Sequence, residues 1–111
     1  DEALAPSDVQ ATLLEFTAMS LADAVNRECT GAHELYVCGG GAHNRALMQR
    51  ISAHLPGIRV ATTATLGIDP DWVEALAFAW LARQTLHHAP GNLPAVTGAR
   101  GERVLGAIYP A

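Results

Sequence analysis

The chain has 111 residues, of which half are hydrophobic and 16% are charged, and its formal net charge is −4 at pH 7. This composition is too apolar for a disordered chain, and its hydrophobic runs are too interrupted for a membrane span. The negative charge and the lack of a basic cluster in the sequence argue against a nucleic-acid-binding surface. The length fits one domain or part of one. Its high apolar content has two explanations, an Ala-rich composition or a surface that packs against a missing segment.

The cysteine and histidine pattern predicts no metal site. Cys29 and Cys38 form no CxxC pair, so reduced thiols in a cytoplasmic protein are the simpler interpretation, although a bridge between them stays open. His87 and His88 are adjacent, so on a helix they point about 100° apart and do not converge on one ion. We therefore expect no metal held by side chains of this chain.

The first predicted element is a helix over residues 8–28. Ser7 and Gln10 have the spacing of a capping box, and Gly31 suits the left-handed position after a helix. One apolar stripe recurs at helical spacing and predicts the buried face: Leu14, Ala18, Leu21 and Val25.

A strand, a second helix and a second strand follow. Residues 34–38 form a short apolar run typical of a buried strand, and they lead directly into three glycines. The second helix extends to about Leu55, with Leu47, Ile51 and Leu55 on one face, before Pro56 stops it. Residues 58–62 alternate as a second strand does.

The last third contains an apolar helix, residues 71–88, for which Asp69 suits the cap and Pro70 the first helical position. This helix is apolar nearly all round, so we expect it to pack on several sides. Residues 92–103 are turn-rich, and residues 104–109 read as a final short strand. The order helix, strand, helix, strand, helix, strand predicts an α/β fold with parallel strands.

The triplet Gly39, Gly40 and Gly41 is the first candidate site. Three residues without Cβ atoms allow backbone N–H groups to approach a ligand, and the helix that follows directs its positive end to the same place. A phosphate or another electronegative group fits there. The alternative is that the glycines serve only a tight turn. Asn44 is either a ligand donor or a local cap, and His43 is more simply a solvated or packed imidazole.

Glu74 is the second candidate, because its neighbours along the helix face, Ala77, Phe78 and Leu81, are apolar. A carboxylate there is either partly buried with partners or displayed at a cleft. The alternative is a helix-start residue that binds nearby N–H groups or lies in solvent. Asp69 and Asp71 have an ordinary capping explanation.

Three stretches together resemble the C-terminal end of the anhydro-N-acetylmuramic acid kinases. They are VCGGGAHN at 37–44, GIDPDWVEA at 67–75 with its continuation to residue 82, and NLPAVTGA at 92–99. The likeness spans about residues 35–110. It implies an actin-like, ribonuclease-H-like fold of two domains around a cleft, of which residues 1–111 would be one C-terminal subdomain.

The resemblance also implies a function. Kinases of this family hydrolyse the 1,6-anhydro ring of anhydro-N-acetylmuramic acid and transfer the ATP γ-phosphate to O6, in the cytoplasmic recycling of cell-wall sugars. It implies that Gly39, Gly40, Gly41 and Asn44 contact the nucleotide and that Glu74 contacts the sugar. ATP would carry Mg²⁺, held mainly through its phosphates. The family's phosphate-binding glycine loop and the aspartate that activates water have no counterpart here, so we assign no catalytic residue.

Three hypotheses remain open from the sequence. The first is a partial kinase, inactive alone, whose partners are ATP and the sugar rather than nucleic acid or a membrane. The second is a non-catalytic nucleotide- or ligand-binding module of the same fold. The third is a structural or homodimer-forming domain that uses the apolar helix 71–88.

Overall fold

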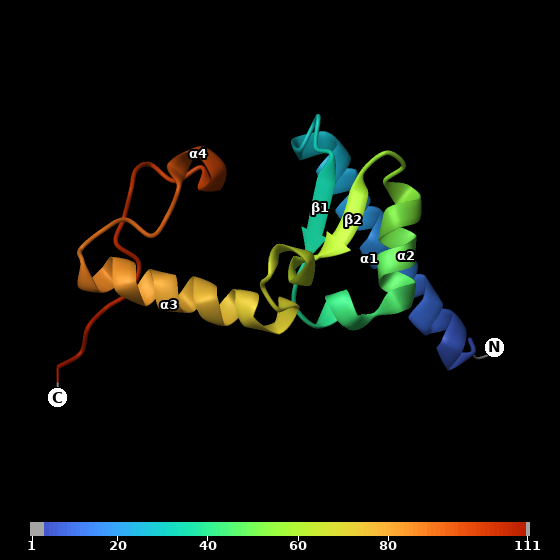
Figure 1. The fold of residues 1–111 in the computed structure, drawn as a ribbon, viewed down its shortest axis with the longest axis horizontal. Coiled ribbons are helices and arrows are strands. Elements are labelled where there is room, and N and C mark those ends of the chain that lie inside the picture. Colours follow the sequence, from blue (N-terminus) through green and yellow to red (C-terminus); the bar gives the residue numbers. More distant parts are fainter. Residues whose placement is uncertain (1–3, 111) are drawn as a thin grey trace. The chain divides into compact units, whose positions relative to one another are not determined.

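A computed structural model describes residues 4–110 of the chain, which divides into two compact units, Asp1–Asp71 and Trp72–Ala111. The first unit contains helix α1 (Pro6–Glu28), strand β1 (Glu34–Val37), helix α2 (Arg45–His54) and strand β2 (Arg59–Thr62). The second contains α3 (Val73–Leu86) and the short α4 (Pro94–Thr97) (Figure 1). Three 3-10 turns, Gly40–His43, Thr63–Leu66 and Pro70–Trp72, connect these elements.

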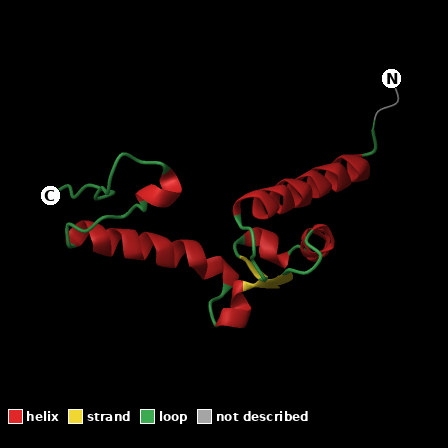
Figure 2. Cartoon of the chain, turned by 90° about the horizontal axis from the view of Figure 1, so that it is seen from above, coloured by secondary structure: helices red, strands yellow, loops and turns green. Residues whose placement is uncertain are grey.

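The sheet of the first unit consists of β1 and β2, which pair in parallel with Leu35 opposite Val60 and Val37 opposite Thr62. Parallel neighbours need a crossover connection, and α2 supplies it. The helices α1 and α2 lie together on one face of the sheet (Figures 1 and 2). The predicted mixed α/β class and the parallel pairing of the first unit are therefore confirmed.

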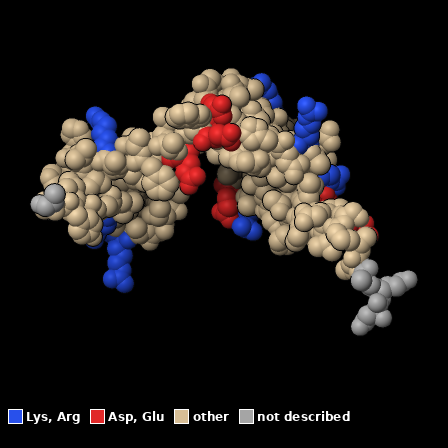
Figure 3. Space-filling model, turned by 90° about the horizontal axis from the view of Figure 1, so that it is seen from below, with Lys and Arg blue, Asp and Glu red and all other residues tan. Residues whose placement is uncertain are grey.

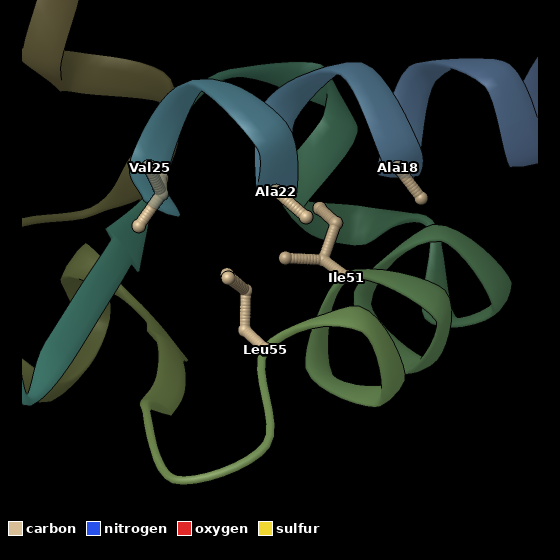
Figure 4. Close-up of a cluster of buried hydrophobic side chains, with 5 residues drawn as sticks. All are labelled: Ala18, Ala22, Val25, Ile51 and Leu55. Carbon is tan, nitrogen blue, oxygen red and sulfur yellow. The ribbon is translucent and has the colours of Figure 1, made fainter. Parts of the chain in front are cut away.

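The core of the first unit lies between α1 and α2 and against the sheet (Figure 4). Ile51 and Leu55 are only 1% and 2% exposed, and burial of each such side chain stabilises the fold by about 1.5–3 kcal/mol. Small side chains at Ala18 and Ala22 face them from α1, so the two helices approach closely. The predicted apolar stripes of both helices are confirmed.

The predicted start of α1 is wrong. Ser7 lies inside the helix, the N-cap is Ala5, and no side chain caps the first turn. Pro6 occupies the first helical position, where its fixed φ is already helical and its missing N–H removes no hydrogen bond. Proline at this position therefore replaces the predicted capping box as the start signal.

The predicted final strand over residues 104–109 is also wrong, because that segment has no regular structure. It runs beside α3 instead of a strand. The hydroxyl of Thr85 donates to the carbonyl oxygen of Leu105 at 2.6 Å, and a Cβ added at Gly106 would lie 2.9 Å from Thr85 Oγ1. Close contact with the helix therefore fixes this segment without a partner strand.

Helix α3 is apolar as predicted, but the expectation that it packs on several sides is wrong for this chain. No residue of α3 is buried, and large side chains on it and just before it are about half or more exposed: Trp72, Leu76, Phe78, Trp80 and Leu86. The turn-rich segment that follows covers the helix only in part. The apolar surplus of the sequence thus lies on an uncovered surface. None of the helices in residues 4–110 combines the length and hydropathy needed to cross a bilayer.

Candidate functional site

The glycine triplet lies directly beyond the carboxyl end of β1, where the chain turns toward α2. Gly39 has φ of +73° and ψ of −175°, a conformation that residues with a Cβ rarely adopt. The 3-10 turn Gly40–His43 begins at the next residue. The backbone therefore requires glycine at position 39, which is what the tight-turn alternative predicts.

Gly40 and Gly41 are different, because neither has a positive φ. A Cβ at Gly40 would meet no atom within 4 Å, and one at Gly41 would make only an ordinary contact of 3.5 Å with Leu47 Cδ2. The leading N–H groups of a helical turn have no intrahelical acceptor. Within residues 4–110, the N–H groups of Gly40 and Gly41 donate to no acceptor. The tight turn explains Gly39 and leaves the other two glycines without a structural reason in this chain.

Asn44 caps α2, since its Oδ1 accepts a hydrogen bond from the N–H of Leu47 at 3.1 Å. This is the local alternative that the sequence left open. The side-chain amide nitrogen makes no hydrogen bond within the described part of the chain. Asn44 also lines a hollow of about 410 Å³ with residues of α1 between Gln10 and Thr17. The Oδ1 atom of Asn44 is thus a helix cap, while its amide nitrogen is a donor without an acceptor among the described residues.

The glycine loop meets a second segment of the first unit, the turn at residues 69–71. The N–H of Gly39 donates to the carbonyl oxygen of Pro70 at 2.9 Å. The imidazole Nε2 of His43 lies 2.9 Å from Asp71 Oδ1, and this hydrogen bond, with the charge of Asp71, raises the pKa of His43. Asp69 Oδ1 accepts the N–H of Asp71 and so caps the short turn Pro70–Trp72, but the predicted cap of the helix is wrong, because α3 begins at Val73 with Trp72 as its N-cap and no side-chain cap among the described residues. Asp71 does not cap: it pairs with His43, which corrects its assignment.

Glu74, the predicted sugar-side carboxylate, is the second residue of α3. It is exposed, and its side chain has no hydrogen-bond partner within residues 4–110. Phe78, one turn further along the helix, is 62% exposed, so the apolar surface next to the carboxylate is open as well. The partly buried alternative and the helix-start hydrogen bond are both absent from the described chain. Glu74 is an exposed carboxylate near the start of α3, which fits the solvated alternative as well as a ligand-binding role.

Among the described residues, no three His, Cys, Asp or Glu side chains converge in a way that could hold an ion. On the face drawn in Figure 3, the basic side chains of each unit stand apart and form no continuous patch. Cys29 and Cys38 are free, so the bridge that the sequence left open does not form.

Comparison with known proteins identifies the family. The family model described as anhydro-N-acetylmuramic acid kinase matches residues 1–111, the whole chain. The chain belongs to the anhydro-N-acetylmuramic acid kinase family. It is 78% identical over 108 residues to the anhydro-N-acetylmuramic acid kinase of Thiobacillus denitrificans, covering 97% of this chain and 29% of that protein.

Two further relatives carry the same name. The protein of Hahella chejuensis is 62% identical over 104 residues, and that of Nitrosomonas europaea is 59% identical over 107 residues. These matches cover 94% and 96% of this chain but only 28% and 30% of the relatives. The chain therefore spans less than a third of the length of the curated kinases that it matches.

Sequence reasoning missed the pairing of His43 with Asp71. Their separation in the sequence carries no periodic signal, and each residue has a common explanation by itself. Only the parallel pairing of β1 and β2, which brings the carboxyl ends of the strands to one edge, places the segments that follow them together. A search for polar residues that follow neighbouring strands would have found the pair.

Proposed function

We propose that this chain supplies a nucleotide-contacting loop and a sugar-contacting carboxylate to an ATP-dependent kinase. The kinase hydrolyses the 1,6-anhydro ring of anhydro-N-acetylmuramic acid and phosphorylates O6. The observation that carries the proposal is Gly40, a glycine that the fold of the chain does not require, with open space where a Cβ would lie. Family membership makes a nucleotide the natural occupant of that space.

The glycine loop suits a nucleotide for two physical reasons. The N–H groups of Gly40 and Gly41 are adjacent donors without acceptors among the described residues, and the amide nitrogen of Asn44 is a third free donor. Without Cβ atoms at positions 40 and 41, the backbone comes within hydrogen-bond distance of a ligand. The loop would therefore bind the electronegative atoms of ATP through Gly39–Gly41 and Asn44.

Glu74 suits a sugar better than a nucleotide. Its carboxylate only accepts hydrogen bonds, and sugar hydroxyls donate them. Anionic phosphates would repel it. The exposed face of Phe78 beside it offers an apolar surface to the carbon skeleton of a sugar. Glu74 would thus orient the anhydro sugar rather than contact the phosphates.

The remaining parts of the reaction lie outside this chain in the proposed enzyme. Phosphoryl transfer depends on positioning and charge stabilisation from both walls of a cleft, which the actin-like fold implied by the resemblance would provide. The water-activating aspartate and the other phosphate loop belong to that second wall. No metal-binding cluster occurs among the described residues, so Mg²⁺ would be held mainly by ATP and the rest of the enzyme. The proposed enzyme acts in the cytoplasm and forms a homodimer.

A chimera tests the proposed function. The matching segment of the Thiobacillus denitrificans kinase is replaced by this chain, to which it is 78% identical. We expect the chimera to consume ATP in the presence of anhydro-N-acetylmuramic acid at a rate close to that of the parent. A folded chimera that binds neither ATP nor the sugar would overturn the proposal. Binding of ATP without turnover would favour the non-catalytic module instead.

A further inference from the structure

The glycine loop has little packing to hold it in place. None of residues 38–44 is buried, and Gly40 and His43 are among the exposed ones. Apolar burial therefore contributes little to fixing the conformation of this segment. Hydrogen bonds hold it instead, both inside the loop, where Ala42 N–H donates to the Gly39 carbonyl and Asn44 N–H to the Gly41 carbonyl, and to other parts of the unit.

Two hydrogen bonds connect the loop to the turn at residues 69–71. The first joins two backbone groups, the N–H of Gly39 and the carbonyl of Pro70, at 2.9 Å. The second joins two side chains at the other end of the loop, His43 Nε2 and Asp71 Oδ1, also at 2.9 Å. The two contacts thus bracket Gly40 and Gly41.

The turn is a firmer element than the loop. Pro70 is buried and has a fixed φ, and Asp69 Oδ1 accepts the N–H of Asp71 at 2.9 Å. The backbone that carries the Asp71 side chain is therefore already restrained. A hydrogen bond to it transfers that restraint to His43 and to the end of the glycine loop.

We propose that His43 is a positioning residue for the nucleotide, which holds the N–H groups of Gly40 and Gly41 in their binding geometry through its hydrogen bond to Asp71. The inference rests on the proposed function, because it takes the glycine loop as the nucleotide contact. It goes beyond that function in assigning a role to a residue that need not touch ATP. Asp71 is the second member of the pair.

The pairing depends on the charge of the imidazole. The hydrogen bond to Asp71 raises the pKa of His43 above its usual 6.5, and the charge of Asp69 acts in the same direction. The charged imidazolium and the carboxylate attract each other below that raised pKa. Above it, the imidazole is neutral and the contact weakens. Nucleotide affinity should therefore fall as the pH rises through the pKa of His43.

Steady-state kinetics of the chimera test the proposal. The pair is exposed, with side chains 61% and 60% accessible, and such pairs change equilibria only modestly. His43→Ala should raise KM for ATP about two- to fivefold while kcat and KM for the sugar stay unchanged. His43→Gln should restore KM only in part, because its amide can still donate to Asp71 but lacks the charge of the imidazolium.

A matched control removes the same chemistry elsewhere. His54 pairs with Glu15 at 2.7 Å at the far end of α2, roughly 15 Å from Asn44 at 1.5 Å per residue. His54→Ala should leave KM for ATP unchanged. In a double-mutant cycle, Asp71→Ala should have no further effect once His43→Ala is present.

The pH profile separates positioning from simple structural support. KM for ATP of the unmutated chimera should rise toward that of His43→Gln as the pH increases above 6.5, since the pKa of His43 is raised and the nucleotide's own titration is common to both. Equal profiles, an unchanged KM in folded His43→Ala, or an equal rise in folded His54→Ala would each overturn the proposal. Gly40→Val in the same chimera tests the loop itself. If it weakens ATP binding while His43→Ala does not, the role of His43 fails and the proposed function stands.

Discussion

The N–H of Gly39 donates to the carbonyl oxygen of Pro70 at 2.9 Å, and this contact joins two segments that lie far apart in the sequence. Each segment follows one of the two parallel strands. Because parallel strands place their carboxyl ends at one edge of a sheet, the loop after β1 and the residues after β2 meet there. The glycine triplet and the turn at 69–71 are therefore parts of one surface of the first unit.

Gly40→Val should weaken ATP binding by the chimera without unfolding it. The open space at Gly40 tolerates a side chain in the free protein, but the same side chain would occupy the position of the ligand. Loss of one or two hydrogen bonds to charged groups predicts roughly 10- to 100-fold weaker affinity. Calorimetry measures the change, with a thermal melt as the control for folding. Unchanged affinity in a folded variant would show that the triplet serves only as a tight turn.

Bound nucleotide should slow the alkylation of Cys38. It is exposed and immediately precedes the triplet, whereas Cys29 is exposed near the opposite end of β1. Saturating ATP should slow alkylation of Cys38 by up to roughly tenfold at ten times its dissociation constant. The label is located by mass spectrometry of the chimera. Cys29 is the internal control, and equal protection of both thiols would argue against binding at the loop.

Acid should weaken the contact between α1 and α2. Arg50 donates two hydrogen bonds to Glu15, at 2.6 and 2.7 Å, and His54 lies 2.7 Å from the same carboxylate. Arg50 and His54 lower the pKa of Glu15 from 4.5 to about 2, chiefly through these hydrogen bonds. A depressed pKa stabilises the fold above pH 4.5, and this contribution is lost as the pH falls toward 2.

Urea unfolding of the chain at pH 7 and pH 2.5 measures this loss. The difference in stability between the unmutated chain and Glu15→Gln should be present at pH 7 and should shrink at pH 2.5. Glu28→Gln is the matched control, because Glu28, at the exposed end of α1, pairs with its neighbour Arg27 and with no other described residue. A Glu15→Gln chain with the same acid dependence as the unmutated chain would exclude the carboxylate as the cause.

Regular periodicity made the first unit predictable from sequence. The stripes that contain Ala18 and Ile51 predicted which faces of α1 and α2 are buried, because packing and helical period agree there. The predicted strand over residues 104–109 was wrong because a short apolar run does not specify what it packs against. In this unit the segment lies against α3. The exposure of α3 was not predictable either, since an apolar helix predicts burial without saying which chain covers it.

The candidate site was predictable only in part. Glycines between a strand and a helix predicted the loop. The N–H groups of Gly40 and Gly41, which donate to no acceptor in residues 4–110, agree with its proposed role. The pairing of His43 with Asp71 depends on tertiary structure, so neither residue stood out by itself. Glu74 was noticed because a carboxylate on an apolar face conflicts with local pattern, and such conflicts mark functional positions more often than ordinary ones.

The 111-residue chain by itself should show no measurable sugar kinase activity. Loss of a general base typically reduces a rate by about 10²–10⁴-fold, before the missing phosphate contacts are counted. An ATP-consumption assay with anhydro-N-acetylmuramic acid measures this, with the chimera as the positive control. Turnover of roughly 1 s⁻¹ or more by the chain alone would show that it contains a complete catalytic site.

Glu74→Gln in the chimera tests most directly whether this chain contacts the sugar separately from the nucleotide. The substitution keeps the size of the side chain and removes its charge, so kcat/KM for the anhydro sugar should fall roughly 10- to 100-fold while ATP affinity stays near that of the unmutated chimera. Glu102→Gln, at another exposed carboxylate of the second unit, should change neither. A folded Glu74→Gln chimera that turns over the sugar normally, or that loses ATP affinity instead, would contradict the proposed role of this chain.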